Sequence, residues 1–144
     1  MKKIVTLVLL VLSFTITAQK EVNTNKKGFA ADGFDVVAYF ENHAVEGNKK
    51  FQTTVAGVKY QFSTAENLAK FKKSPNKYSP QYGGWCAYAI GAKNEKVEIN
   101  PKTFEIRDGK LYLFYNSWGI NTLKLWKKEG AEKLREQADK NWSL

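Results

Sequence analysis

Residues 103–115 read Thr103-Phe104-Glu105-Ile106-Arg107-Asp108-Gly109-Lys110-Leu111-Tyr112-Leu113-Phe114-Tyr115 and carry the strongest structural pattern in the chain. Asp108-Gly109 separates two short runs, 103–107 and 110–115, that contain aromatic and branched apolar residues. A type I′ turn needs positive φ at both central residues, and an Asp-Gly pair suits that conformation. The stretch therefore predicts a β-hairpin.

A second hairpin is predicted upstream of the first. Strand-like runs at 51–55 and 58–62 flank Ala56-Gly57, which is a plausible two-residue turn. Shorter strands are predicted at 36–40, where β-branched and aromatic residues follow a glycine turn, and more weakly at 95–99.

Helices are predicted between and after these hairpins. Ser63 and Glu66 have the spacing of a capping box before apolar residues at helical intervals, and Pro75 ends that helix. Ser117 is a reasonable cap for a C-terminal helix, in which Gly130 makes a break or a kink. Hairpins and helices without regular strand-helix-strand alternation indicate an α+β fold, with short antiparallel strands and C-terminal helices.

The N-terminus has the layout of a secretory signal peptide. Lys2 and Lys3 precede an apolar run that ends at small residues, with cleavage expected after Ala18. The run is too short for a confident membrane span, so we expect no stable span after cleavage. We therefore expect a signal peptide at 1–18, a flexible leader at 19–28 and a single domain at 29–144, in a protein exported to the periplasm or the extracellular space.

The charge of the chain limits its partners. The formal net charge is +9, and the loss of Lys2 and Lys3 leaves +7. This charge is almost all lysine, whereas bidentate recognition of phosphate or guanine prefers arginine, and only Arg107 and Arg135 are present. We expect no nucleic-acid partner, although loose adsorption to anionic polymers or lipid is open and would weaken with salt.

The only cysteine lies in a glycine-rich and aromatic stretch, Pro80-Gln81-Tyr82-Gly83-Gly84-Trp85-Cys86-Ala87-Tyr88-Ala89-Ile90. Cys86 and the single histidine, His43, are candidate ligands for copper or zinc, with Asp35 and Glu66 as possible oxygen donors. A closed zinc site usually takes four side chains, so this set predicts at most a sparse metal site. The alternative is a buried, inert Cys86 with His43 in a distant loop.

Two further readings concern the same stretch. A thiol paired with an imidazole is the minimum for cysteine hydrolase chemistry, but only His43 could act as the base, and no protease signature surrounds Cys86; we expect no enzyme. Tyr82, Trp85 and Tyr88 could line a pocket for a flat or cationic small molecule. Core packing of these rings is the alternative.

Several motifs in fixed order carry a resemblance. They are Asp35-Val36-Val37-Ala38-Tyr39-Phe40, Tyr60-Gln61-Phe62-Ser63-Thr64-Ala65-Glu66-Asn67 with Phe71, Pro75 and Tyr78, Tyr82-Gly83-Gly84-Trp85-Cys86-Ala87-Tyr88, Asp108-Gly109-Lys110-Leu111-Tyr112-Leu113 and Ala138-Asp139-Lys140-Asn141-Trp142. The set resembles the exported YHS domain proteins of bacteria and extends over 33–142. The resemblance implies a small α+β domain and, by analogy, a metal-related role.

This chain departs from the wider YHS group where metal ligands would stand. Domains attached to metal-transporting ATPases carry an Asp-Pro-Val-Cys motif and a further cysteine after a phenylalanine. Here Val36 replaces the proline, Ala38 stands at the first cysteine, and 62–71 contains no cysteine. What the resemblance carries over is Asp35 and the frame of strand, hairpin and helix, while Cys86 belongs to the motif of the exported subfamily.

The sequence therefore favours an exported YHS domain protein that binds a transition metal weakly, or a small molecule, near Cys86. The alternative is a non-catalytic structural or interaction module in which Cys86 is buried and inert. An enzyme that uses the thiol is a distant third reading.

Overall fold

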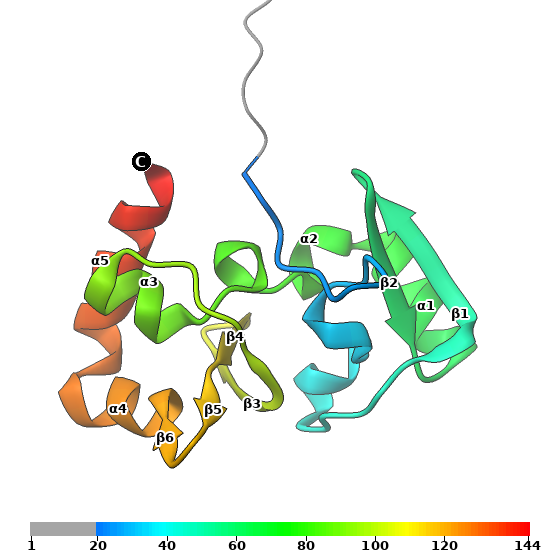
Figure 1. The fold of residues 1–144 in the computed structure, drawn as a ribbon. Coiled ribbons are helices and arrows are strands. Elements are labelled where there is room, and N and C mark those ends of the chain that lie inside the picture. Colours follow the sequence, from blue (N-terminus) through cyan, green and yellow to red (C-terminus); the bar gives the residue numbers. More distant parts are fainter. Residues whose placement is uncertain (1–19) are drawn as a thin grey trace, which may run out of the picture.

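Five α-helices and three two-stranded antiparallel sheets form the described part of the chain, residues 20–144 of a computed structural model (Figure 1). The helices are α1 (Ala65–Lys73), α2 (Pro75–Tyr78), α3 (Ala87–Lys93), α4 (Thr122–Glu129) and α5 (Ala131–Ser143). The sheets pair β1 (Asn48–Val55) with β2 (Val58–Phe62), β3 (Asn100–Arg107) with β4 (Lys110–Phe114), and β5 (Asn116–Ser117) with β6 (Ile120–Asn121). Three short 3-10 helices are η1 (Ala31–Gly33), η2 (Ala38–Glu41) and η3 (Gln81–Gly84). The predicted α+β class is confirmed.

Strand β4 connects two hydrophobic cores. Leu111 and Leu113 belong to a core formed with the N-terminal half, and Tyr112 and Phe114 belong to a core formed with the C-terminal helices. Successive side chains of a strand point to opposite faces, so one strand can serve both cores. Figure 1 shows β3 and β4 between the β1–β2 hairpin on one side and α3, α4 and α5 on the other.

Each half packs around large buried side chains. Tyr39, Phe62 and Phe71 are fully buried in the N-terminal half, and Trp126 is fully buried in the C-terminal half. In the C-terminal half, α3 and α5 approach closely at Gly91, where a Cβ atom would lie 2.6 Å from the backbone oxygen of Leu134. These buried rings and this close contact hold the helices and strands of each half in place.

Both predicted hairpin turns are confirmed. Ala56 and Gly57 have φ of 49° and 80°, and Asp108 and Gly109 have φ of 49° and 71°. The third hairpin, β5–β6, was not predicted.

The strands predicted at 36–40 and 95–99 are wrong. Residues 38–41 form η2 because the Asp35 carboxylate accepts hydrogen bonds from the backbone N–H groups of Val37 and Ala38, which folds the chain into a turn. Residues 95–99 have no regular structure, and β3 begins only at Asn100.

The helix caps differ from the prediction by a few residues. Thr64 caps α1 by accepting from the backbone N–H of Asn67, while Ser63 turns its hydroxyl to Asp35. Asn121, not Ser117, caps α4. Gly130, with φ of 106°, separates α4 from α5, so the C-terminus consists of two helices in series.

The segment after the predicted signal peptide is bound to the domain. The backbone N–H of Asn23 donates to the oxygen of Gly83 over 2.8 Å, and Asn23 itself is buried. Residues 20–28 therefore belong to the fold, which corrects the expectation of a flexible leader and a domain that begins at residue 29. The predicted signal peptide, 1–18, lies outside the described residues.

Candidate functional site

Cys86 lies at the start of α3 and is fully buried, with 0% of its surface exposed. Gly83 and Gly84, with φ of 61° and 80°, turn the chain immediately before it. The backbone N–H of Cys86 donates to Val97 over 3.0 Å, and its carbonyl oxygen accepts from Ile90 over 3.1 Å. The glycines and these two bonds fix the thiol in place.

The sulfur of Cys86 has two polar neighbours. Cys86 Sγ lies 3.3 Å from Thr122 Oγ1 and accepts from the backbone N–H of Tyr115 over 3.4 Å. The Thr122 hydroxyl donates its single proton to the carbonyl oxygen of Tyr115 over 2.8 Å, because a carbonyl can only accept. Thr122 Oγ1 is therefore left as the acceptor for the Cys86 thiol.

A pocket of about 360 Å³ lies against this thiol, in the C-terminal half. Its lining comes from the start and body of α3, the segment 95–97, the residue between β4 and β5, β6 and α4. It consists of Cys86, Tyr88, Ala89, Lys93, Glu95, Val97, Tyr115, Ile120, Thr122 and Leu125. We call it the Cys86 pocket. Its size lies within the range of small-molecule sites, and its lining combines apolar side chains with a few polar groups.

The Tyr88 phenol adds an oriented polar group to the Cys86 pocket. Its hydroxyl donates to Glu129 Oε1 over 2.9 Å. Burial, with a smaller effect of this hydrogen bond, raises the pKa of Tyr88, so the phenol stays neutral at physiological pH.

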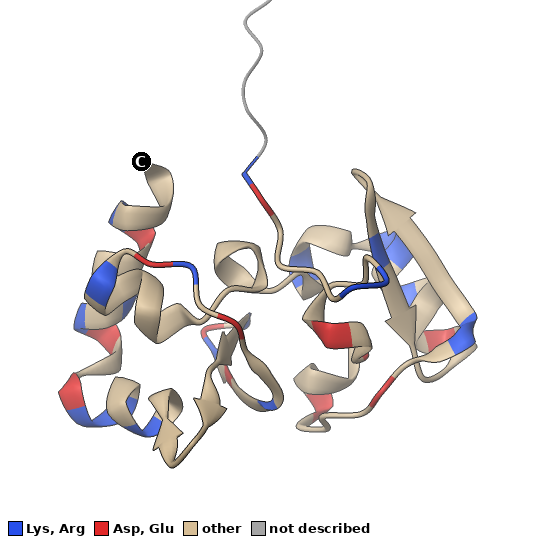
Figure 2. Ribbon diagram, viewed as in Figure 1, with Lys and Arg blue, Asp and Glu red and all other residues tan. Residues whose placement is uncertain are grey.

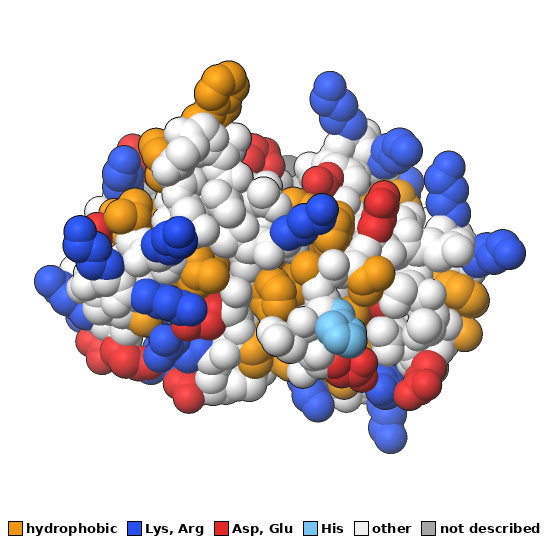
Figure 3. Space-filling view, turned by 90° about the horizontal axis from the view of Figure 1, so that it is seen from below, with side chains coloured by type: hydrophobic (Ala, Val, Ile, Leu, Met, Phe, Trp, Pro, Cys, Tyr) orange, Lys and Arg blue, Asp and Glu red, His pale blue; other side chains and the backbone are white. Residues whose placement is uncertain are grey.

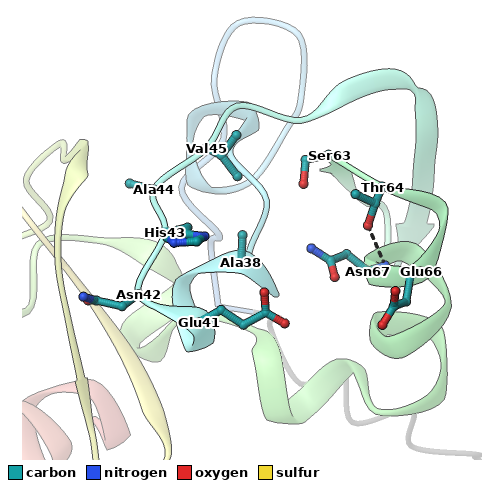
Figure 4. A pocket seen from close by; sticks show the side chains of 10 residues that line it. All are labelled: Ala38, Glu41, Asn42, His43, Ala44, Val45, Ser63, Thr64, Glu66 and Asn67. Atoms are coloured by element: carbon teal, nitrogen blue, oxygen red, sulfur yellow. Dashed lines mark hydrogen bonds between the residues drawn. The ribbon is translucent and has the colours of Figure 1, made fainter.

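His43 lines a different hollow, in the N-terminal half, which we call the His43 hollow. It has a volume of about 690 Å³ and is lined by Ala38, Glu41, Asn42, His43, Ala44, Val45, Ser63, Thr64, Glu66 and Asn67. Figure 4 shows the residues of η2 and the following loop on one side and those around the start of α1 on the other. Lys70 Nζ lies 3.0 Å from Glu66 and 3.6 Å from Glu41, so one lysine is shared by the two carboxylates.

Asp35 is buried between these elements and has no free coordination capacity. Its Oδ1 accepts from Val37 and Ala38, and its Oδ2 accepts from Ser63 N, Ser63 Oγ and Asn67 Nδ2, all over 2.7 to 3.1 Å. Five donors fill the lone-pair sites of the carboxylate. Asp35 joins the turn before η2 to the start of α1 and has a structural role.

Of the four predicted metal ligands, only His43 and Glu66 line the same hollow. Cys86 and His43 line separate pockets, Asp35 is fully bonded, and Glu66 is paired with Lys70. Within residues 20–144 no three His, Cys, Asp or Glu side chains are grouped so that they could hold a metal ion. The structure therefore does not bring the four side chains into one group, and a metal site that uses Cys86 or His43 stays a prediction.

The three aromatic residues predicted to share a pocket also separate. Tyr82 is a core residue whose hydroxyl donates to Asp139 over 2.8 Å, and Trp85 donates its ring N–H to the backbone of Glu21. Tyr88 alone lines the Cys86 pocket. Sequence analysis missed Val97, Ile120 and Leu125, which are ordinary apolar residues that only the tertiary structure brings to Cys86.

Comparison of the chain with models of known protein families, with curated proteins and with solved structures finds no match. No helix within residues 20–144 is long and apolar enough to cross a membrane.

Proposed function

We propose that the protein is an exported binding domain of the YHS type that holds a small, largely apolar molecule in the Cys86 pocket and does not catalyse a reaction. The observation that carries the proposal is the pocket itself, which has apolar walls from Ala89, Val97, Ile120 and Leu125. Lys93 and Glu95 also line it and offer charges of both signs. A ligand with an apolar body and one polar end fits this distribution.

The state of the thiol supports binding rather than catalysis. A nucleophilic cysteine needs a base or a cation beside it to form the thiolate. Cys86 instead donates to a threonine hydroxyl and accepts from a backbone N–H, and the only histidine lines another pocket. These two contacts already engage the sulfur, so we propose an organic ligand rather than a metal ion.

Two sequence features support the remaining parts of the proposal. The basic, apolar and small-residue pattern of 1–18 supports export, and the ordered motifs between 33 and 142 support the YHS assignment. Neither feature specifies the ligand, which is inferred from the pocket alone.

A neutral fluorescent probe tests the pocket. N-phenyl-1-naphthylamine brightens in apolar surroundings and is small enough for this volume. We expect the wild-type domain to bind about one equivalent, and Ala89→Leu to weaken binding at least about tenfold because the added side chain occupies the pocket. The matched control is Ala92→Leu, on the same helix but exposed, which should leave the affinity unchanged.

Equal affinity of the two leucine variants would overturn the site, and so would absence of binding to the wild type. Circular dichroism and urea unfolding of both variants establish that the fold is retained. Mass spectrometry of the protein isolated from its native compartment then searches for the bound molecule, and this should be absent from Ala89→Leu.

A further inference from the structure

The third hairpin contains an unusual turn residue. Strand β5 pairs with β6 through Ser117 and Ile120, so Trp118 and Gly119 form a two-residue turn. Their φ values are 52° and 76°, close to those of Ala56-Gly57 and Asp108-Gly109. Such turns favour Asn, Asp or Gly at the first position, and a bulky side chain with positive φ is rare. Backbone preference therefore gives no reason for a tryptophan at this turn.

Packing gives no reason either. Trp118 is 92% exposed and Ile120, on the same hairpin, is 51% exposed. The positive φ of Trp118 costs free energy that no packing of its side chain offsets, and residues with backbone strain of this kind cluster at functional sites. Contact with a ligand or surface outside the domain would explain a tryptophan at this hairpin tip.

Positive charge adjoins this tip. Helix α4 begins directly after β6 and carries Lys124, Lys127 and Lys128, which are all exposed and share one face at spacings of three and four. The acidic residue of the helix, Glu129, accepts from Tyr88. Figure 2 places blue segments on α4 next to β6, and Figure 3, seen from below, shows Lys and Arg side chains on that half of the molecule, with apolar and acidic side chains among them.

We propose that the β5–β6 tip docks on an anionic membrane surface, with Trp118 in the interfacial layer and the α4 lysines near the lipid headgroups. Indole rings favour the interface between water and hydrocarbon, and lysines near an anionic bilayer add attraction that does not require a fixed geometry. A protein partner fits less well, because stable interfaces bury roughly 1,200 Å² or more and this convex tip offers two apolar side chains.

Co-sedimentation with vesicles tests the docking surface. At low salt, we expect wild-type protein to bind phosphatidylcholine vesicles that contain about one third phosphatidylglycerol, and not pure phosphatidylcholine. Trp118→Asn should lower the partition coefficient about tenfold. Changing Lys124, Lys127 and Lys128 to Gln should lower it about fivefold per lysine, and added salt should weaken wild-type binding.

The other hairpin offers a matched control. Ala56→Asn makes the same new residue at the same position of the β1–β2 turn and should leave vesicle binding unchanged. Trp118→Asn should also raise the melting temperature, because Asn tolerates positive φ, so loss of binding would not reflect unfolding. Probe affinity in the Cys86 pocket should be unaffected, which keeps this proposal separate from the proposed function. The membrane proposal would be overturned if the wild type did not bind anionic vesicles, or if Trp118→Asn bound them equally well. Binding of a protein by Trp118 would not restore it.

Discussion

The two halves of the fold each bury a polar group, but they bond it differently. Asp35 in the N-terminal half and Cys86 in the C-terminal half are both 0% exposed. Asp35 accepts five hydrogen bonds of 2.7 to 3.1 Å, whereas the thiol of Cys86 makes two longer contacts of 3.3 and 3.4 Å. A buried charge must be completely bonded, while a buried thiol behaves as a small apolar group.

This difference in bonding indicates that Asp35 has a structural role, whereas Cys86 can border a binding site. The five donors to Asp35 come from two parts of the chain and close around it, so no space is left for a ligand. The thiol of Cys86 needs few hydrogen-bond partners, so a pocket can lie beside it. The residue that looks most like a metal ligand by charge is therefore structural, and the less polar residue borders the candidate site.

The largest loss of stability is expected when Asp35 is changed. Asp35→Asn keeps the shape of the side chain but turns an amide N–H₂ group toward at least two backbone or side-chain donors. Lost bonds and a buried donor without an acceptor should lower the free energy of unfolding by about 3 kcal/mol or more. Urea unfolding followed by circular dichroism measures the change.

Asp32→Asn is the matched control for that substitution. Asp32 lies three positions earlier in the chain, is exposed, and has positive φ that Asn tolerates. The control makes the same change of charge and should alter stability by less than about 0.5 kcal/mol. Similar losses in the two variants would mean that net charge, and not the hydrogen bonds of Asp35, determines stability.

Alkaline pH should distinguish the buried Tyr39 from the half-buried Tyr88, with a smaller effect on stability. Burial, aided by Asp32 and Asp35, strongly raises the pKa of Tyr39 above 10, so its phenol stabilises the fold fully below pH 10. That contribution is lost as pH rises above the unfolded-state pKa, at up to about 1.4 kcal/mol per pH unit. Tyr39→Phe should therefore flatten the decline of stability above pH 10, as measured by urea unfolding at a series of pH values.

Tyr88 provides the comparison from the C-terminal half. Its phenol is only half-buried, so although burial and the bond to Glu129 raise its pKa, it should ionise in the native protein before Tyr39 does, and Tyr88→Phe should remove that titration. Absorbance at the phenolate band follows this directly. If Tyr39 ionised in the folded protein as readily as Tyr88, burial would not be what holds the proton of Tyr39.

The sequence correctly predicts the elements that are determined by residues close together in the chain. The hairpins at Ala56-Gly57 and Asp108-Gly109 are predicted correctly because the turn preference belongs to the dipeptide. The predicted strand at 36–40 is wrong because its β-branched residues are overruled by Asp35, whose bonds to Ser63 and Asn67 span 28 and 32 positions. The Trp118-Gly119 turn was missed because tryptophan is not a turn residue, although the glycine between short runs was a usable clue.

The candidate site depends still more on distant contacts. Sequence singled out Cys86 and offered two environments for it, a ligand site with His43 or an inert burial. The structure buries the thiol as the second reading has it, yet places a pocket beside it that Val97, Ile120 and Leu125 complete. These residues come from three separate segments, and no periodicity or spacing connects them to Cys86.

The smallest effect is expected at the thiol. A serine hydroxyl at position 86 can still donate to Thr122 and accept from Tyr115, so Cys86→Ser should change stability by less than about 1 kcal/mol. Cys86→Ala removes both contacts and should cost slightly more, about 1 to 2 kcal/mol, because the backbone N–H of Tyr115 loses its acceptor.

Reactivity gives a sharper test of the same contacts. Because the thiol is buried, a disulfide reagent should reach it only when the fold opens locally, at least about a hundredfold more slowly than in the unfolded chain. Saturation with the neutral probe should slow the reaction further if the probe occupies the adjoining pocket. Rapid native-state labelling would instead reveal an accessible thiolate, remove the contrast with Asp35, and return Cys86 to consideration as a metal ligand or nucleophile.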